Sequence, residues 1–434
     1  MPDLSEYIEA VDWLSPVEVR GRVTELVGLL IRASAPGARV GELCLIRSPH
    51  RTRPLRAEVV GFSGSEVILM PLGDIQDVAM GAEVVSTGAS LRVRVGDALL
   101  GRVLDGMGEP ADGRGEIESS QERAVEARPP DPMRRRRVTK SLTTGVRAID
   151  GCLTVGEGQR VGVYAAAGVG KSTLLGMIAR NTEADVNVIA LVGERGREVR
   201  DFVEQDLGDE GLRRSVVIAA TSNEPSLVRM KAAYVATTIA EYFRDQGRRV
   251  LLMMDSVTRF ARALREVGLA AGEPPARSGF PPSVFAELPK LLERTGNSER
   301  GSITAFYTVL VEGDDMTEPV ADETRSILDG HIVLSRPLAA LGHYPAIDVN
   351  QSVSRVMTAV ADARHVESSR RLREVLATYE SQRDLISVGA YKKGSDPRTD
   401  YALSKLDSVN AFLRQGTHEK SEAAASVRQL QNIF

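Results

Sequence analysis

Cysteine and aromatic residues are scarce in this chain. Its 434 residues include 2 cysteines, Cys44 and Cys152, and only 4% are aromatic. Two cysteines are too few for a disulfide framework or a thiolate-ligated metal site, and they are typical of a protein kept in the reducing cytoplasm. The 5 histidines are scattered without metal-ligand spacing, so we expect no histidine-based metal centre.

Long apolar runs and an excess of positive charge are also lacking. No run approaches the roughly 18 apolar residues that a membrane-spanning helix needs, and the acidic N-terminus does not have the pattern of a secretory signal. The formal net charge of −4 argues against nucleic acid as the main partner. With 42% hydrophobic and 26% charged residues, the composition predicts a globular cytoplasmic protein with a sizeable core.

The hydrophobic pattern changes along the chain and predicts its organisation. After a short N-terminal segment, residues 1–12, short alternating segments in residues 13–95 predict a β-barrel domain. Residues 96–360 are expected to form the next domain: from Leu142 to about Ser354, near-continuous apolar runs alternate with helical stretches, which predicts a mostly parallel sheet covered by helices on both faces. Residues 361–434 are polar and helical in pattern. We therefore expect an α/β protein with an N-terminal β-barrel and a C-terminal α-helical domain.

The most informative motif is a glycine-rich loop that follows the apolar run Val161–Ala165 and precedes a helical stretch. Glycine lets successive backbone N–H groups turn toward phosphate oxygens, and a helix N-terminus favours the same negative charge. A lysine can then hold the outer phosphates, and a serine hydroxyl can reach Mg²⁺. The strict pattern has glycine where this chain has Ala165, and a simple strand-to-helix turn is the alternative. The predicted nucleotide-binding residues are Ala167, Gly168, Val169, Gly170, Lys171, Ser172 and Thr173.

Two carboxylates follow apolar runs further along the chain. Glu194 comes after the run that ends at Val192, and Asp255 directly follows Val250–Met254. The carboxyl ends of parallel strands meet at one edge of a sheet, where ligands bind. Glu194 is suited to orient or deprotonate an attacking water, and Asp255 is suited to hold Mg²⁺ through its water shell. Alone, each acid is equally explained as a helix cap or a surface charge; beside a phosphate loop, they predict a catalytic set.

The segment from Tyr344 to Arg355 offers an aromatic ring and an arginine. Tyr344 is able to stack on adenine, although a core tyrosine packed by Pro345 is the alternative. Arg355 is either a surface ion-pair residue or an arginine finger that one subunit supplies to its neighbour's nucleotide. Elsewhere, the run Arg134–Arg137 lies beside prolines, so we expect a solvated connector there.

Together these segments resemble the rotary-type ATPase superfamily. The resemblance is carried by GVGKST, GERGREV, LLMMDSVTRFARA and PAIDVNQSVSR. Within the superfamily the chain is most similar to the flagellar and type III secretion export ATPases, through VRGRVTELVG, LLGRVLDGMGEP, TTGVRAIDG and GAYKKGSDPRTD. The similarity covers nearly the whole chain.

The resemblance implies a homohexameric ring with a RecA-like P-loop core that hydrolyses ATP with Mg²⁺. This activity would release chaperones from secretion substrates and unfold the substrates, at the periphery of the inner-membrane export apparatus. The implied partners are a coiled-coil central stalk protein, a stator-like peripheral protein, the export gate and chaperone–substrate complexes. No nucleic acid is expected.

The resemblance also implies roles for individual residues. Lys171 and Ser172 bind phosphates and metal, Glu194 activates water, Arg195 and Arg259 line the phosphate end, Asp255 is the second acid and a metal ligand, Tyr344 packs on adenine, and Arg355 is the finger supplied in trans. The chain departs from the usual family loop at Ala166 and Ala167, where a glycine and a serine are usual.

Other classes of protein share parts of this pattern. A non-catalytic nucleotide-binding subunit tends to lack the carboxylate that Glu194 supplies. A ring-shaped RNA translocase should carry aromatic residues on its barrel, but Phe62 is the single aromatic between Leu14 and Val95. The catalytic subunit of an ion-translocating rotary ATPase is closer kin; the segment GAYKKGSDP and the proline-rich stretch Glu273–Pro282 argue against it.

Overall fold

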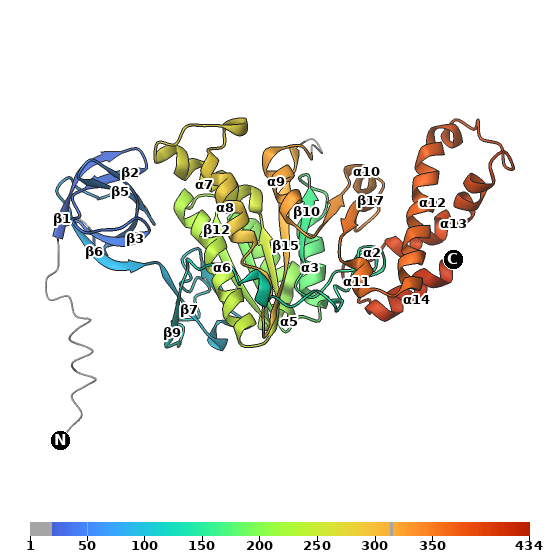
Figure 1. The fold of residues 1–434 in the computed structure, drawn as a ribbon, viewed down its shortest axis with the longest axis horizontal. Coiled ribbons are helices and arrows are strands. Elements are labelled where there is room, and N and C mark those ends of the chain that lie inside the picture. The colour runs from blue at the N-terminus through green and yellow to red at the C-terminus, as the bar shows by residue number, and fades with distance from the viewer. Residues whose placement is uncertain (1–19, 50, 313–315) are drawn as a thin grey trace, which may run out of the picture.

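The computed structural model describes residues 20–49, 51–312 and 316–434. Figure 1 shows a β-barrel, an α/β domain and a helical domain arranged in that order along the long axis of the molecule. The expected N-terminal segment, residues 1–12, lies outside the described residues. No helix among those described is long and apolar enough to cross a membrane.

The N-terminal strands close into a barrel, as the alternating pattern predicts. The strand order is β1-β2-β5-β4-β3-β6. Inward residues such as Ile31, Cys44 and Leu69 are fully buried and form a core of their own, because alternate side chains of each strand point to opposite faces. The strands are β1 (Arg20–Val27), β2 (Leu30–Ala33), β3 (Glu42–Arg47), β4 (Leu55–Ser63), β5 (Glu66–Pro71) and β6 (Glu83–Ser90).

A short ribbon connects the barrel to the central domain. Strand β7 (Arg92–Val95) pairs with β9 (Gln121–Ala124) and not with the barrel. Val93 and Val95 of β7 are buried in the core of the central domain. Lys231 of the central domain, 2.7 Å from Glu58 of β4, joins the barrel to that domain by a buried ion pair.

The central sheet has the order β17-β16-β10-β15-β13-β11-β12-β8. Its pairs are parallel except at the edge strand β17, which runs antiparallel to β16; β14 (Gly296–Asn297) pairs with β15 off this path. The strands are β8 (Val103–Asp105), β10 (Arg160–Ala165), β11 (Val186–Glu194), β12 (Ser215–Thr221), β13 (Arg249–Asp255), β15 (Ser302–Leu310), β16 (Gly330–Leu334) and β17 (Ile347–Ser354). The mostly parallel sheet is confirmed.

Helices cover both faces of this sheet. Successive residues of a central strand enter different cores: Leu252 packs on the side of α6, α7 and α8, and Leu251 packs on the side of α3. Such a strand has no solvent face, which is why it appears in the sequence as a continuous apolar run. The helices are α2 (Arg147–Cys152), α3 (Lys171–Asn181), α4 (Gly196–Asp201), α5 (Gly208–Arg213), α6 (Ser226–Asp245), α7 (Val257–Ala270), α8 (Pro282–Leu292), α9 (Pro319–Ile327), α10 (Arg336–Ala340) and α11 (Met357–Val360).

The C-terminal part is helical, as predicted, with α12 (Ala363–Ser387), α13 (Pro397–Leu413) and α14 (Ala423–Ile433). Phe412 and Leu430 are fully buried and pack against α2 of the central domain. A side chain added at Gly151 would lie 2.7 Å from the Phe412 ring, so glycine is required for this close approach. The helical domain is thereby packed against the central domain.

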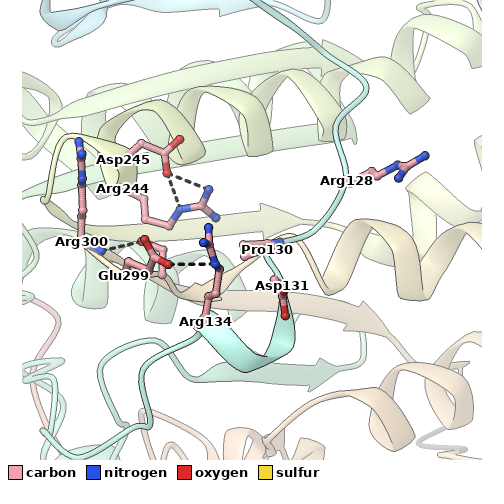
Figure 2. Close-up of a pocket in the computed structure, with 9 residues that line it drawn as sticks. Arg128, Pro130, Asp131, Arg134, Arg244, Asp245, Glu299 and Arg300 are labelled. Carbon is pink, nitrogen blue, oxygen red and sulfur yellow. Dashed lines mark hydrogen bonds and ion pairs between the residues drawn. The ribbon is translucent and has the colours of Figure 1, made fainter.

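The expectation of a solvated connector at the arginine run is wrong for Arg135, whose side chain is largely buried, while Arg136 is exposed but also bonded to the protein. Arg135 donates to the carbonyls of Pro130, Glu293 and Thr295, and Arg136 to those of Ser298, Arg300 and Gly301. Figure 2 shows Arg134 beside Glu299 on the wall of a cavity of about 440 Å³. The run therefore fastens the connector to the segment between α8 and β15.

Candidate active site

The phosphate loop lies where β10 ends and α3 begins, at the carboxyl edge of the sheet. Gly168 and Gly170 have φ angles of 81° and 89°, in the left-handed region that other residues rarely adopt. A Cβ added at Gly168 would meet nothing within 4 Å. The backbone conformation, and not crowding by the protein, is therefore what requires glycine at this position.

The N-terminus of α3 is open to a ligand. Within the described chain no side chain caps this helix, and Ser172 in its first turn is exposed. The first N–H groups of a helix have no partner inside it, so this end is suited to an anion. Ala166 is buried in the core beneath the loop, while Ala167 is exposed. The loop therefore accommodates both departures from the usual family sequence.

A cluster of charged side chains lies directly behind the loop. The Nζ atom of Lys171 is 2.5 Å from Asp255 Oδ1 and 3.7 Å from Glu194 Oε1. Asp255 ends β13 and Glu194 ends β11, and these strands are neighbours in the sheet. Arg259 of α7 brings its Nε to 3.2 Å from Glu194 Oε1. The structure thus brings together Lys171, Glu194, Asp255 and Arg259, and their roles in catalysis stay predictions.

The environment of Glu194 adjusts its proton affinity. Burial, together with the charge of Asp255, raises the pKa of this carboxyl to about 7, although Lys171 and Arg259 oppose the rise. A group with a pKa near neutrality is well suited to accept a proton from water. Asp255 is held by a second bond, because Thr308 donates its hydroxyl to Oδ1 at 2.8 Å.

The site offers few ligands of its own to a metal ion. Among the residues described, no group of three or more histidine, cysteine, aspartate or glutamate side chains is arranged to hold one. Mg²⁺ does not need such a group, because proteins usually bind it through one or two side chains together with waters and substrate phosphates. The exposed Ser172 hydroxyl and the Asp255 carboxylate fit that donor set, and their role as ligands remains a prediction.

Tyr344 lies beside the phosphate loop. Its ring is 3.6 Å from the position of a Cβ built on Gly170, and 46% of the residue is exposed. Its carbonyl accepts a hydrogen bond from the Gln415 amide at 2.9 Å, which links this position to the helical domain. An exposed ring at the loop is available for stacking, in contrast to a packed core tyrosine.

Arg195 and Arg355 lie outside the cluster. Arg195 is exposed and pairs with Glu198. Arg355 follows Ser354 of β17, which pairs with Gly330 at the start of β16, so Arg355 lies at the amino edge of the sheet. The phosphate loop is at the opposite edge, about 16 Å away along β10 at the usual rise per residue. Arg355 therefore cannot reach the loop of its own chain.

Thr308 is the site residue that sequence analysis missed. It lies within β15, which is otherwise mostly apolar, and its hydroxyl reaches Asp255. A polar residue near the carboxyl end of a buried run was the available signal.

Comparison with known proteins identifies the class of this fold and site. The model of the ATP synthase alpha/beta family, nucleotide-binding domain, matches residues 145–354, and that of the same family's β-barrel domain matches residues 23–88. The model of the T3SS EscN ATPase C-terminal domain matches residues 361–432. The chain is therefore an ATPase of the alpha/beta type, and a nucleotide is its substrate.

Full-length relatives define the branch. The chain is 52% identical to the flagellum-specific ATP synthase of Bacillus subtilis (strain 168), over 98% of both chains. It is 54% identical to the type 3 secretion system ATPase of Xanthomonas euvesicatoria, over 95% of this chain and 93% of the relative. The structure of the assembled ATPase EscN from enteropathogenic E. coli superimposes with a TM-score of 0.90 at 47% identity, over 95% of this chain and 99% of that one. The chain belongs to the flagellar and type III secretion ATPase family.

Proposed function

We propose that this chain forms a homohexameric ring that hydrolyses ATP with Mg²⁺ at the cytoplasmic face of a type III export apparatus. Hydrolysis releases chaperones from secretion substrates and unfolds the substrates for delivery to the export gate. A coiled-coil stalk protein and a stator-like peripheral protein are the proposed partners. The solved complex of EscN with its central stalk EscO supports the first of these.

Each residue of the site has a distinct task in this proposal. The N–H groups of the loop and Lys171 bind the phosphates, and Tyr344 carries the adenine. Glu194 accepts the proton of the attacking water, while Arg259 holds the Glu194 carboxylate in place. Ser172 and Asp255 would hold Mg²⁺, which would supply positive charge to offset the charge developing on the phosphate oxygens.

The separation of Arg355 from the phosphate loop carries the proposal. An exposed arginine at the far edge of the sheet cannot serve its own nucleotide, but it is available to a neighbouring subunit. A complete site then needs two copies of the chain. The same chain contains both the Glu194 carboxylate and Arg355, so a ring of identical subunits can complete its own sites.

Turnover as a function of protein concentration tests this dependence on assembly. The rate per subunit should rise with concentration, because the shared site exists only in the oligomer. A rate per subunit that stays constant from dilute monomer to assembled ring would contradict a shared site.

Mixed rings test the role of Arg355 directly. Arg355→Ala should lower turnover by about 10³- to 10⁵-fold, as for a lost arginine finger, and leave ATP bound to the variant's own loop. In a mixed ring, a site formed by a Glu194→Gln subunit and the altered finger of an Arg355→Ala neighbour carries both defects. A site formed the other way round, by the Glu194 of an Arg355→Ala subunit and the Arg355 of a Glu194→Gln neighbour, is intact. Part of the activity should return. No recovery, in rings shown to contain both variants, would place Arg355 outside the shared site.

A further inference from the structure

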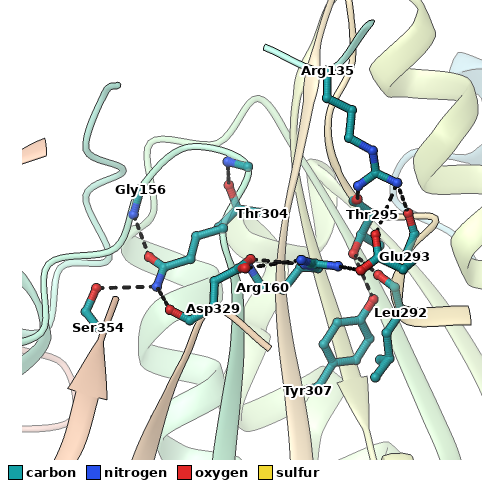
Figure 3. Close-up of polar contacts among 12 residues, drawn as sticks. Arg135, Gly156, Arg160, Leu292, Glu293, Thr295, Thr304, Tyr307, Asp329 and Ser354 are labelled. Carbon is teal, nitrogen blue, oxygen red and sulfur yellow. Dashed lines mark hydrogen bonds and ion pairs between the residues drawn. The ribbon is translucent and has the colours of Figure 1, made fainter. Parts of the chain in front are cut away.

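We propose that a polar network at the amino edge of the sheet, formed by Gln159, Arg160 and Asp329, positions Arg355 for its neighbour. This inference rests on the proposed function of Arg355. The network is drawn in Figure 3, where Arg160 lies between Asp329 and Glu293. These three are positioning residues, because they act on the backbone that carries Arg355.

The backbone of Arg355 is held at a single carbonyl. The Arg355 amide donates to the Asp329 carbonyl at 3.0 Å. The side-chain amide of Gln159 donates to the same carbonyl at 3.0 Å and lies 3.3 Å from the Ser354 hydroxyl. Gln159 is fully buried, and its oxygen accepts the Gly156 amide at 2.8 Å. The end of β17 is therefore bonded to the turn that leads into β10.

The side chain of Asp329 also helps to hold this residue, and therefore its carbonyl, in place. It accepts the Arg160 amide at 3.1 Å and two guanidinium N–H groups of Arg160, from Nε at 3.0 Å and from Nη2 at 3.1 Å. Arg160 also pairs with Glu293, whose carbonyl accepts from Arg135. The Asp329 side chain is thus bonded to both the backbone and the side chain of Arg160, the first residue of β10.

The guanidinium of Arg355, by contrast, is weakly held. Its one described hydrogen bond joins Nη2 to the Arg325 carbonyl at 3.4 Å. The starting point of the side chain is set by the backbone network, and a misplacement of about 1 Å in a catalytic group can cost about 10²-fold in rate. Strand β10 therefore carries the subunit's own phosphate loop at one end and fixes the arginine offered to the neighbour at the other.

Asp329→Asn and Ser354→Ala test the network, and Asp185→Asn is a matched control. Asp185 holds Arg249 at the head of β13 through the same three donors, the amide, Nε and Nη2, and it does not contact Arg355. We expect kcat to fall about 10- to 100-fold in Asp329→Asn and less in Ser354→Ala. The affinity for a fluorescent ATP analogue should stay unchanged in both, and the control should keep its kcat.

Combination with Arg355→Ala separates this inference from the proposed function. If the network acts through Arg355, Arg355→Ala/Asp329→Asn should be no slower than Arg355→Ala alone, and Asp329→Asn should be rescued in mixed rings by Glu194→Gln. Additive losses, or an Asp329→Asn enzyme as fast as the control, would overturn the inference. If Asp329→Asn fails to fold, the same comparison with Ser354→Ala decides. Unchanged turnover in Arg355→Ala itself would instead refute the proposed function.

Discussion

The two edges of the central sheet hold their charged residues in different ways. At the carboxyl edge, Lys171, Asp255 and Glu194 are paired mainly with one another behind an open loop. At the amino edge, Arg160 and Arg135 are bonded to backbone groups or to carboxylates that are themselves bonded to the backbone.

Because of this difference, charged side chains at the carboxyl edge can exchange partners, whereas those at the amino edge cannot. Lys171 can move from Asp255 to a phosphate without disturbing the backbone, since only side chains are involved. Release of Arg160 would leave a half-buried guanidinium and an aspartate without partners, which is costly at a partly buried site. We infer that the carboxyl edge rearranges with nucleotide while the amino edge remains a fixed frame.

The largest effect should come from Lys171→Ala at the carboxyl edge. The phosphates lose their fixed counter-charge, and the two buried carboxylates lose the cation between them, so ATP hydrolysis should fall to background. Steady-state hydrolysis and nucleotide affinity are the measurements, with the exposed Lys420→Ala as the control for loss of a positive charge. Hydrolysis by Lys171→Ala at even a tenth of the wild-type rate would contradict the assignment.

Glu194→Gln should come next, with a loss of about 10³-fold in single-turnover hydrolysis, within the range for a general base. The amide keeps the shape of the carboxylate but cannot accept the proton, so ATP should still bind. Glu204→Gln is the matched control, because Glu204 is an exposed carboxylate that pairs with Arg200. Equal losses of binding and hydrolysis in Glu194→Gln would make Glu194 a structural residue.

The pH dependence should reveal the same carboxylate with a smaller effect. A base must be ionised, so kcat/KM should be full above the Glu194 pKa of about 7 and fall about tenfold for each pH unit below it. Arg259 lowers this pKa, and Arg259→Leu should therefore move the acidic limb to higher pH. Arg262→Leu, which removes an exposed cation of the same helix paired with Glu312, should leave the limb in place. If the acidic limb of the kcat/KM profile lies at the same pH in both variants, Glu194 is not the group whose ionisation shapes the profile.

The carboxyl edge was largely predictable from sequence, and the amino edge was not. Buried runs predicted strands such as β11 and the acid at its end, because a strand covered on both faces has no polar residue until it reaches solvent. The edge strand β17 is partly exposed and its pattern is mixed, so it was not recognised. Partners such as Asp329 and Arg160 are 169 positions apart in the chain, and no local pattern links them.

The smallest expected effect is on the free energy of unfolding, and it comes from a substitution at the amino edge. Arg135→Ala removes the guanidinium that bonds the carbonyls of Pro130, Glu293 and Thr295, and whose side chain is only 18% exposed. Unfolding of the ATPase domain in urea should become easier by about 1–3 kcal/mol, the cost of leaving partly buried polar groups without partners.

Arg137→Ala, in an exposed residue of the same run, should stay within about 0.5 kcal/mol. Turnover by folded Arg135→Ala should remain near the wild-type rate, because Asp329 keeps its own bonds to Arg160. If Arg135→Ala is as stable as Arg137→Ala, the carbonyls that Arg135 bonds are able to hydrogen-bond to water instead, with no loss of stability. The amino edge would then be less fixed than its hydrogen bonds indicate, and the contrast between the two edges of the sheet would weaken.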